Sequence, residues 1–161
     1  HTCRLLHVSY YLGRVHMDKR PNKFTELIHF FESLPENERR ENLMLFAKKV
    51  DKWVPDGEIN YFIQDVRKDE HCTDEVGIFV NSTNDTISFR VSLGPKVQTL
   101  TRAIASILCE ISENGKIDHF QAIKKNDISR IIGQELVRLR SQTVYYILER
   151  MQEALVNLKG K

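Results

Sequence analysis

The stretch DEHCTDEVGIFV, residues 69–80, places a cysteine in a short polar segment that leads directly into an apolar run. From Val76 to Val80 every second residue is a branched aliphatic one, and this alternation predicts a β-strand with one buried face. Cys72 then lies in a loop that ends in a central strand. Rigid structure would hold its thiol in place while water can still reach it, and a reactive cysteine needs both. An unreactive surface cysteine fits the same context, so other features must decide.

A second strand follows the first after a turn-rich connection. Residues 86–93 alternate apolar and polar side chains, and the connection 81–86 consists of Asn, Ser, Thr and Asp, which favour turns. Gly94-Pro95 ends this second strand. The segments 75–80 and 86–93 are therefore predicted to pair as an antiparallel hairpin.

Apolar residues at helical spacing dominate the rest of the chain. The predicted helices span residues 22–34, 35–53, 97–113, 117–123, 127–134 and 141–158. Residues 58–68 alternate imperfectly and fit either a short edge strand or an ordered loop. Because helices precede and follow the hairpin without βαβ alternation, the expected fold class is α+β, a small antiparallel sheet covered by helices. The helices at 97–113 and 141–158 are expected to pack on the sheet.

Composition limits the class of protein. The chain has 161 residues, of which 41% are hydrophobic and 29% charged, as in a globular domain. We expect one domain over residues 22–161, preceded by an N-terminal arm over residues 1–21. The net charge of +2 predicts no nucleic-acid partner, and no apolar run is long enough to predict a membrane span. Residues 1–17 contain no acid, which fits the remnant of a transit peptide or an ordinary basic arm.

The cysteines indicate the redox compartment. Cys3, Cys72 and Cys109 are odd in number and widely spaced, which argues against a disulfide framework. We therefore expect a reducing intracellular compartment, either a mitochondrial or plastid interior or a cytoplasm of the bacterial type. Cys109 stands beside an apolar helical stripe and is predicted to be buried and unreactive.

Cys72 is the only candidate reagent that the sequence offers. The chain lacks a glycine-rich phosphate loop, a Cys-x-x-Cys pair and the common hydrolase and metalloprotease motifs, so no cofactor is expected. Cys3 and His7 lack a second pair at zinc-site spacing, so no metal site is expected either. The neighbouring His71 could lower the pKa of the Cys72 thiol, whereas the acids at positions 69, 70, 74 and 75 would raise it.

The order of elements resembles that of the SufE family, the sulfur-acceptor partners of cysteine desulfurases. The likeness extends from about residue 24 to residue 158 and includes the cysteine loop and strand, HCTDEVGI at 71–78, and Arg140-Ser141-Gln142 before the last helix. The chain departs from the family at four places. His71 replaces a glycine, residues 75 and 77 replace Gln and Trp, and Gly94-Pro95 replaces a Ser-Asp pair.

The resemblance implies a mechanism. The Cys72 thiolate would take the outer sulfur of a desulfurase persulfide and pass it to iron–sulfur cluster assembly. Such a protein is a persulfide acceptor and desulfurase activator rather than a stand-alone enzyme. Arg140 would position the loop or contact the partner, with His71 beside it. Both residues also fit a simpler role as solvated side chains, Arg140 at the start of a helix and His71 in a loop.

An alternative interpretation uses the same fold without the chemistry. The four departures and the arm at 1–21 fit a degenerate SufE-like domain, kept as a structural subunit of a larger assembly in an organelle or elsewhere. The partner is then that assembly rather than a cysteine desulfurase. The retained Cys72 and Arg140 favour the sulfur acceptor.

Overall fold

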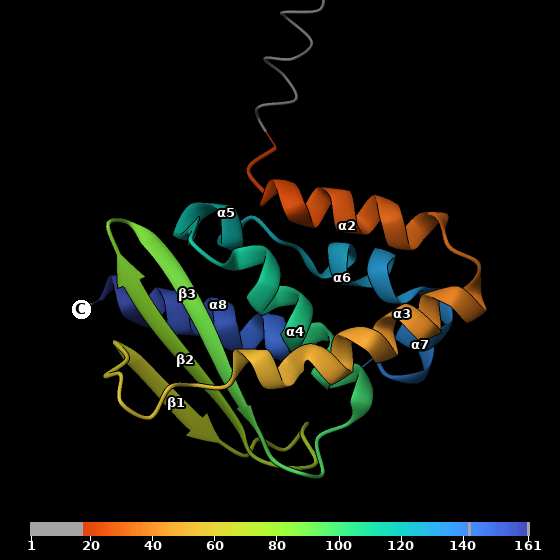
Figure 1. The fold of residues 1–161 in the computed structure, drawn as a ribbon. Helices are drawn as coiled ribbons and strands as arrows, with labels where there is room; N and C mark the ends of the chain where they lie inside the picture. Colours follow the sequence, from red (N-terminus) through yellow and green to blue (C-terminus); the bar gives the residue numbers. More distant parts are fainter. Residues whose placement is uncertain (1–17, 142, 161) are drawn as a thin grey trace, which may run out of the picture.

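The computed structural model describes residues 18–141 and 143–160 and confirms the α+β fold. Figure 1 shows the order of the elements along the chain. The strands are β1 (Ile63–Arg67), β2 (Val76–Thr83), β3 (Thr86–Leu93) and β4 (Gly115–Lys116). The helices are α2 (Asn22–Ser33), α3 (Glu36–Lys48), the 3-10 helix η1 (Lys49–Trp53), α4 (Thr99–Ser112), α5 (Ile117–Gln121), α6 (Lys125–Ile132), α7 (Gln134–Leu139) and α8 (Tyr146–Lys159).

The predicted hairpin is present and is longer than the sequence indicated. Strands β2 and β3 pair antiparallel, with Val76 opposite Leu93 and Thr83 opposite Thr86. Only Asn84 and Asp85 form the turn, and both have positive φ angles, of 52° and 66°. Asn and Asp tolerate this left-handed backbone, which suits a two-residue hairpin turn.

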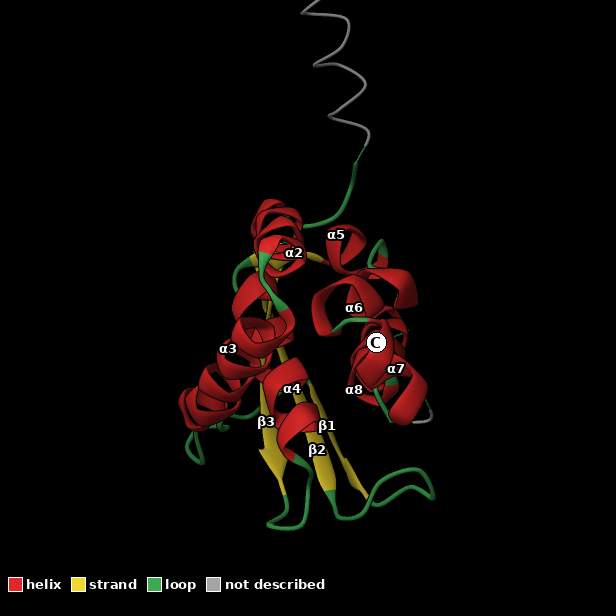
Figure 2. Cartoon of the chain, turned by 90° about the vertical axis from the view of Figure 1, so that its right-hand side faces the viewer, coloured by secondary structure: helices red, strands yellow, loops and turns green. Residues whose placement is uncertain are grey.

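The described part of the sheet has the order β1-β2-β3-β4 and is antiparallel throughout. Residues 63–67 of the ambiguous segment form the edge strand β1, which decides between the two alternatives for that segment. Helices α4 and α8 pack on one face of the sheet, as predicted. In Figure 2, α4 lies in front of the strands, with α3 to its left and α8 to the right of the strands. The alternating apolar residues of β2 and β3 are buried beneath them.

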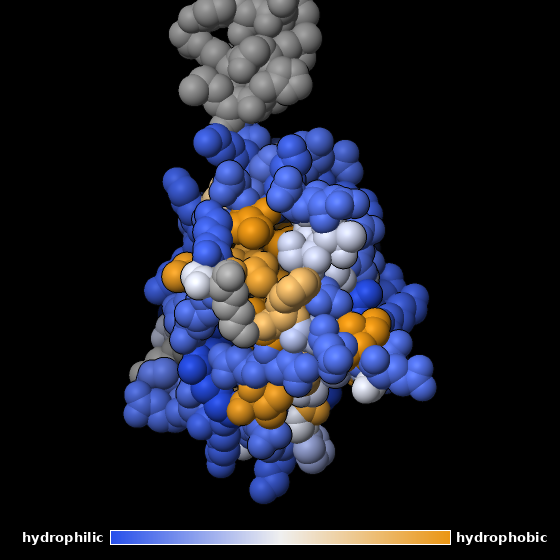
Figure 3. Space-filling view, turned by 90° about the vertical axis from the view of Figure 1, so that its left-hand side faces the viewer, coloured by the Kyte–Doolittle hydropathy of each residue, from blue (hydrophilic) through white to orange (hydrophobic). Residues whose placement is uncertain are grey.

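The other face of the sheet carries a mixture of side chains. Phe79 is half-buried there, and the ring of Tyr61 contacts it edge-on at 5.5 Å between centroids. The segment that leads into β1 and β1 itself expose large apolar residues, namely Val54, Ile59, Phe62 and Val66. Figure 3 views the molecule from the side on which β1 lies in Figure 1 and shows hydrophobic residues grouped within a polar surround.

The last helix begins later than predicted. Helix α8 starts at Tyr146 rather than at Ser141. The backbone N–H groups of Thr143 and Val144 both donate to the Arg140 carbonyl and form a turn before the helix. The short helix α7, which was not predicted, ends at Leu139. Gly133 separates α6 from α7 with a φ of 90°, which favours glycine.

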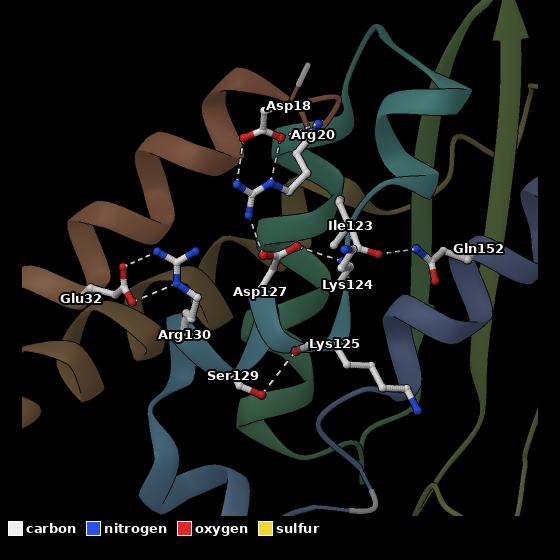
Figure 4. A network of polar contacts seen from close by, with 10 residues as sticks. All are labelled: Asp18, Arg20, Glu32, Ile123, Lys124, Lys125, Asp127, Ser129, Arg130 and Gln152. Carbon is white, nitrogen blue, oxygen red and sulfur yellow. Dashed lines mark hydrogen bonds and ion pairs between the residues drawn. The ribbon is translucent and has the colours of Figure 1, made fainter. Parts of the chain in front are cut away.

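An ion pair fixes the chain before α2 to helix α6. Arg20 Nη1 donates to Asp127 Oδ1 at 2.6 Å, and two other guanidinium nitrogens bind Asp18. Asp127 also accepts from the Lys124 backbone N–H at 2.8 Å (Figure 4). Residues 18–20, at the end of the predicted arm, are therefore attached to the body of the domain.

Candidate functional site

Cys72 lies in the loop that joins β1 to β2, as the sequence predicted. Its side chain is half-buried and packs against the hydrophobic core. Its backbone N–H donates to the Asp69 carbonyl at 3.1 Å, which closes a turn just before the cysteine. Cys72 is therefore partly exposed, and its backbone N–H is held by the turn.

A small pocket beside Cys72 brings distant parts of the chain to the thiol. Its walls are the side chains of His71, Thr73, Gln98, Thr101, Thr143 and Tyr146. They come from the cysteine loop, from the start of α4 and from the start of α8. The hydroxyls of Thr73, Thr143 and Tyr146 donate their protons elsewhere. The Gln98 amide and the Thr101 hydroxyl are the wall groups that could donate a hydrogen bond to a sulfur anion.

The loop is anchored on its C-terminal side to residues 94–96. Thr73 Oγ1 donates to the Lys96 carbonyl at 2.8 Å, and the Lys96 N–H donates to Asp74 Oδ2 at 2.9 Å. The backbone N–H groups of Lys96 and Glu75 hold the pKa of the Asp74 carboxyl below its usual value. A Cβ on Gly94 would lie 2.3 Å from the Asp74 Cγ, so the loop can pack this closely only on a glycine.

On its N-terminal side the loop is anchored to α8. The Tyr146 hydroxyl donates to Asp69 Oδ2 at 2.7 Å, and Arg67 Nε lies 3.2 Å from the same oxygen. The hydrogen bond from Tyr146 holds the pKa of Asp69 below its usual value, and Arg67 and Arg150 act in the same direction. Burial raises the pKa of Tyr146 to about 12, so this phenol keeps its proton at neutral pH.

His71 is close to the thiol, whereas Arg140 is not part of its pocket. His71 lines the pocket at Cys72, is half exposed, and places Nε2 3.4 Å from Glu70 Oε1. Arg140 follows α7 and lines a separate cleft of about 490 Å³, whose apolar wall includes Leu43 and Leu136. Both cavities include Gln98 in their walls, so Arg140 lies in the cavity next to that of the cysteine. The prediction that Arg140 stands at the start of the last helix is wrong.

Sequence reasoning missed Tyr146 and Arg150. Both face the cysteine loop from α8, and Arg150 is 2% exposed. The available signal was their spacing of four residues on a helix whose apolar stripe includes Ile147 and Met151. An arginine beside such a stripe is ordinarily solvated, so the spacing alone did not reveal a buried pair.

Cys109 is buried, as predicted, with no exposed surface. Burial raises the pKa of its thiol far above the usual value, so the thiolate is disfavoured. Among the described residues, no group of three or more His, Cys, Asp or Glu side chains could hold a metal ion. Cys3 and His7 lie outside the described residues. Within residues 18–141 and 143–160, no helix is both long and apolar enough to span a membrane.

Two solved structures share this fold. A hypothetical protein from Thermus thermophilus superposes with a TM-score of 0.67 at 17% identity, covering 88% of this chain and 99% of that protein. The N-terminal part of a nitrogen-fixing NifU-like protein from Brucella abortus superposes with a TM-score of 0.60 at 12% identity, covering 74% of this chain and 93% of that protein. No protein-family model and no curated protein sequence matches the chain. At these identities the likeness establishes the fold alone.

Proposed function

We propose that this chain is a sulfur acceptor of iron–sulfur metabolism, in which Cys72 takes persulfide sulfur from a cysteine desulfurase. The observation that carries the proposal is the half-buried Cys72, set in a loop that is anchored on both sides. The fold shared with a NifU-like protein supports a role in iron–sulfur cluster assembly. The resemblance of the loop and the last helix to the SufE family supports the sulfur-transfer step.

The step itself is a thiol exchange. The Cys72 thiolate attacks the outer sulfur of the donor persulfide, and a new S–S bond forms at Cys72 Sγ. The S–S bond of the donor breaks, and its electron pair leaves on the donor cysteine thiolate, which then takes up a proton. The exchange needs neither an oxidant nor a reductant. It does need the Cys72 thiol reduced at the start, which fits a reducing compartment.

Intact mass spectrometry tests this function. The protein is incubated with a purified cysteine desulfurase and cysteine, and the mass of the acceptor is measured along with desulfurase turnover. We expect Cys72 to gain one sulfur atom and turnover to rise. Cys72→Ser should abolish both effects, whereas the matched variant Cys109→Ala should retain them, because Cys109 is buried.

The alternative function is a structural subunit with an idle Cys72. The exposed apolar residues of the 54–66 segment favour it, because a permanent partner could cover such a surface. The same experiment separates the two functions. If a panel of cysteine desulfurases gives neither a sulfur adduct nor faster turnover with the wild-type protein, the acceptor function is wrong and the structural one remains.

A further inference from the structure

A buried arginine lies at the root of the cysteine loop. Arg150 Nη2 donates to the Asp65 carbonyl at 2.8 Å and to the Val76 carbonyl at 2.9 Å. Asp65 belongs to β1 and Val76 is the first residue of β2, so Arg150 bridges the two strands near the points where the loop leaves and re-enters the sheet. The arginine thereby links the two ends of the loop, which the ladder also pairs at Arg67 and Val76.

A chain of hydrogen bonds leads from this arginine to the cysteine backbone. Arg150 Nη1 donates to the Tyr146 hydroxyl, which donates to Asp69 Oδ2 at 2.7 Å. The Asp69 carbonyl accepts the Cys72 N–H at 3.1 Å. Tyr146 also forms part of the wall of the pocket beside Cys72. Two residues of α8 thus determine where the cysteine backbone stands.

Stability alone does not explain this arrangement. A fully buried guanidinium loses its hydration, and replacing such a charge by apolar residues of similar size is often neutral or stabilising. Arg150 Nε moreover has no hydrogen-bond partner among the described residues. A buried polar network of this kind selects one geometry of the backbone that it touches, and here that backbone belongs to the loop of Cys72.

We propose that Arg150 and Tyr146 are positioning residues that hold Cys72 for attack on the donor persulfide. This inference rests on the proposed function. Sulfur exchange requires the attacking sulfur to meet the donor S–S bond in line, and a loop that samples several geometries spends less time aligned. The network acts on the rate of transfer rather than on binding of the donor protein, because Tyr146 and Arg150 are 7% and 2% exposed and offer a docking protein little surface.

Tyr146→Phe tests the proposal, and Tyr145→Phe is its matched control. The Tyr145 hydroxyl lies 2.7 Å from Ser129 Oγ, so Tyr145→Phe loses one side-chain hydrogen bond, whereas Tyr146→Phe loses two, one to Asp69 and one from Arg150. Only Tyr146 is connected to the cysteine loop. Both variants should lower the melting temperature, Tyr145→Phe by about 2–6 °C and Tyr146→Phe by more, because it loses a second hydrogen bond.

Two measurements separate positioning from a merely structural role. With a cysteine desulfurase as donor, Tyr146→Phe should lower the maximal rate of sulfur transfer about tenfold and leave the half-saturating donor concentration unchanged. Exchange of the Cys72 amide hydrogen should become about tenfold faster in Tyr146→Phe, the equivalent of one lost hydrogen bond. Tyr145→Phe should match the wild-type protein in both measurements.

Arg150→Lys provides a second variant. It keeps the charge but lacks the planar fork that reaches two carbonyls and a phenol, so we expect it to lose transfer rate as Tyr146→Phe does. A wild-type rate of sulfur transfer in Tyr146→Phe, or an equal loss of that rate in Tyr145→Phe, would overturn the proposal. If the wild-type protein accepts no sulfur, the acceptor function is wrong, and amide exchange remains as the test of whether Tyr146 holds the loop. Unchanged amide exchange in Tyr146→Phe would then overturn the positioning role as well.

Discussion

The hydroxyl of Tyr146 and the carboxylate of Asp69 lie 2.7 Å apart, although 77 residues separate them in the chain. This contact joins the last helix to the cysteine loop. Its donor keeps its proton at neutral pH, and its acceptor stays ionised because the pKa of Asp69 is lowered. The link therefore depends on the ionised form of one carboxyl group.

The first prediction concerns acid. Because the folded-state pKa of Asp69 lies below its unfolded value, about 3.9, the stabilisation is complete above that pH and is lost as pH falls through the folded pKa. We expect protection of the Cys72 amide hydrogen to fall on acidification below about pH 4. Hydrogen exchange corrected for the intrinsic rate measures this.

Asp69→Asn should remove that acid dependence and weaken protection of the same amide at neutral pH. Asp118→Asn is the control, because Asp118 is exposed and lies in α5. If protection of the Cys72 amide in Asp69→Asn followed the wild-type curve, the contact with Tyr146 would not hold the loop.

The second prediction concerns the two described cysteines. Iodoacetamide should modify Cys72 in the folded protein and leave Cys109 unmodified, since Cys109 is fully buried and its thiolate is disfavoured. Peptide mapping after timed alkylation measures both sites. Cys109 should react only when urea unfolds the chain, so equal rates in native buffer would contradict its burial.

Local patterns predicted most of the fold. Alternation over 76–91 predicted a hairpin, and helical spacing predicted α2, α3, α4 and α8. Burial of one face of a strand places apolar residues at every second position, and burial of one face of a helix places them at every third or fourth position, so both patterns are visible in the sequence. The polar residues Asn81 and Ser82 suggested a turn but belong to β2. Strand β4 has two residues, and it forms because Gly115 meets Ile87 in the folded structure. No local pattern encodes such a contact.

The site was only partly predictable. The position of Cys72 before a strand is local, and so is its neighbour His71. The contacts of Arg150 with Asp65 and Val76 span 85 and 74 residues, and hydrogen bonding across such distances leaves no periodic signal. Arg140 was placed at the start of a helix because the apolar stripe of α8 extends back to Val144. The turn that delays the helix depends on backbone hydrogen bonds.

The third prediction concerns the ion pair between Arg20 and Asp127. Asp127 is 4% exposed and accepts from both Arg20 and the Lys124 N–H, so its removal takes one partner from a half-buried guanidinium that keeps Asp18 and removes the acceptor of the N–H just before α6. Asp127→Ala should lower the free energy of unfolding by about 1–3 kcal/mol. Urea denaturation followed by circular dichroism measures it.

The control for Asp127→Ala is Glu36→Ala. It breaks an exposed pair with Arg40 at 2.9 Å and should change the unfolding curve little. Similar losses of unfolding free energy in the two variants would mean that burial of Asp127 does not strengthen its ion pair with Arg20.

The last prediction concerns Gly77, in strand β2. A Cβ at Gly77 would lie 2.3 Å from Ser92 Oγ and 2.9 Å from both Phe79 Cε1 and Val66 Cγ2. The Phe79 ring thus lies against the glycine on the outer face of the sheet. Gly77→Ala should lower the free energy of unfolding by about 1–2 kcal/mol, because the Ser92 hydroxyl, the Phe79 ring and the Val66 methyl group must all move.

Gly57→Ala is the matched control for Gly77→Ala, since a Cβ there meets no atom within 4 Å, and it should be neutral or slightly stabilising. Phe79→Ala removes the ring that obstructs the new methyl group. The double variant Gly77→Ala/Phe79→Ala should therefore lose less stability than the sum of the two single variants. Additive losses in urea denaturation would show that Phe79 does not exclude a side chain at position 77, and the glycine would need another explanation.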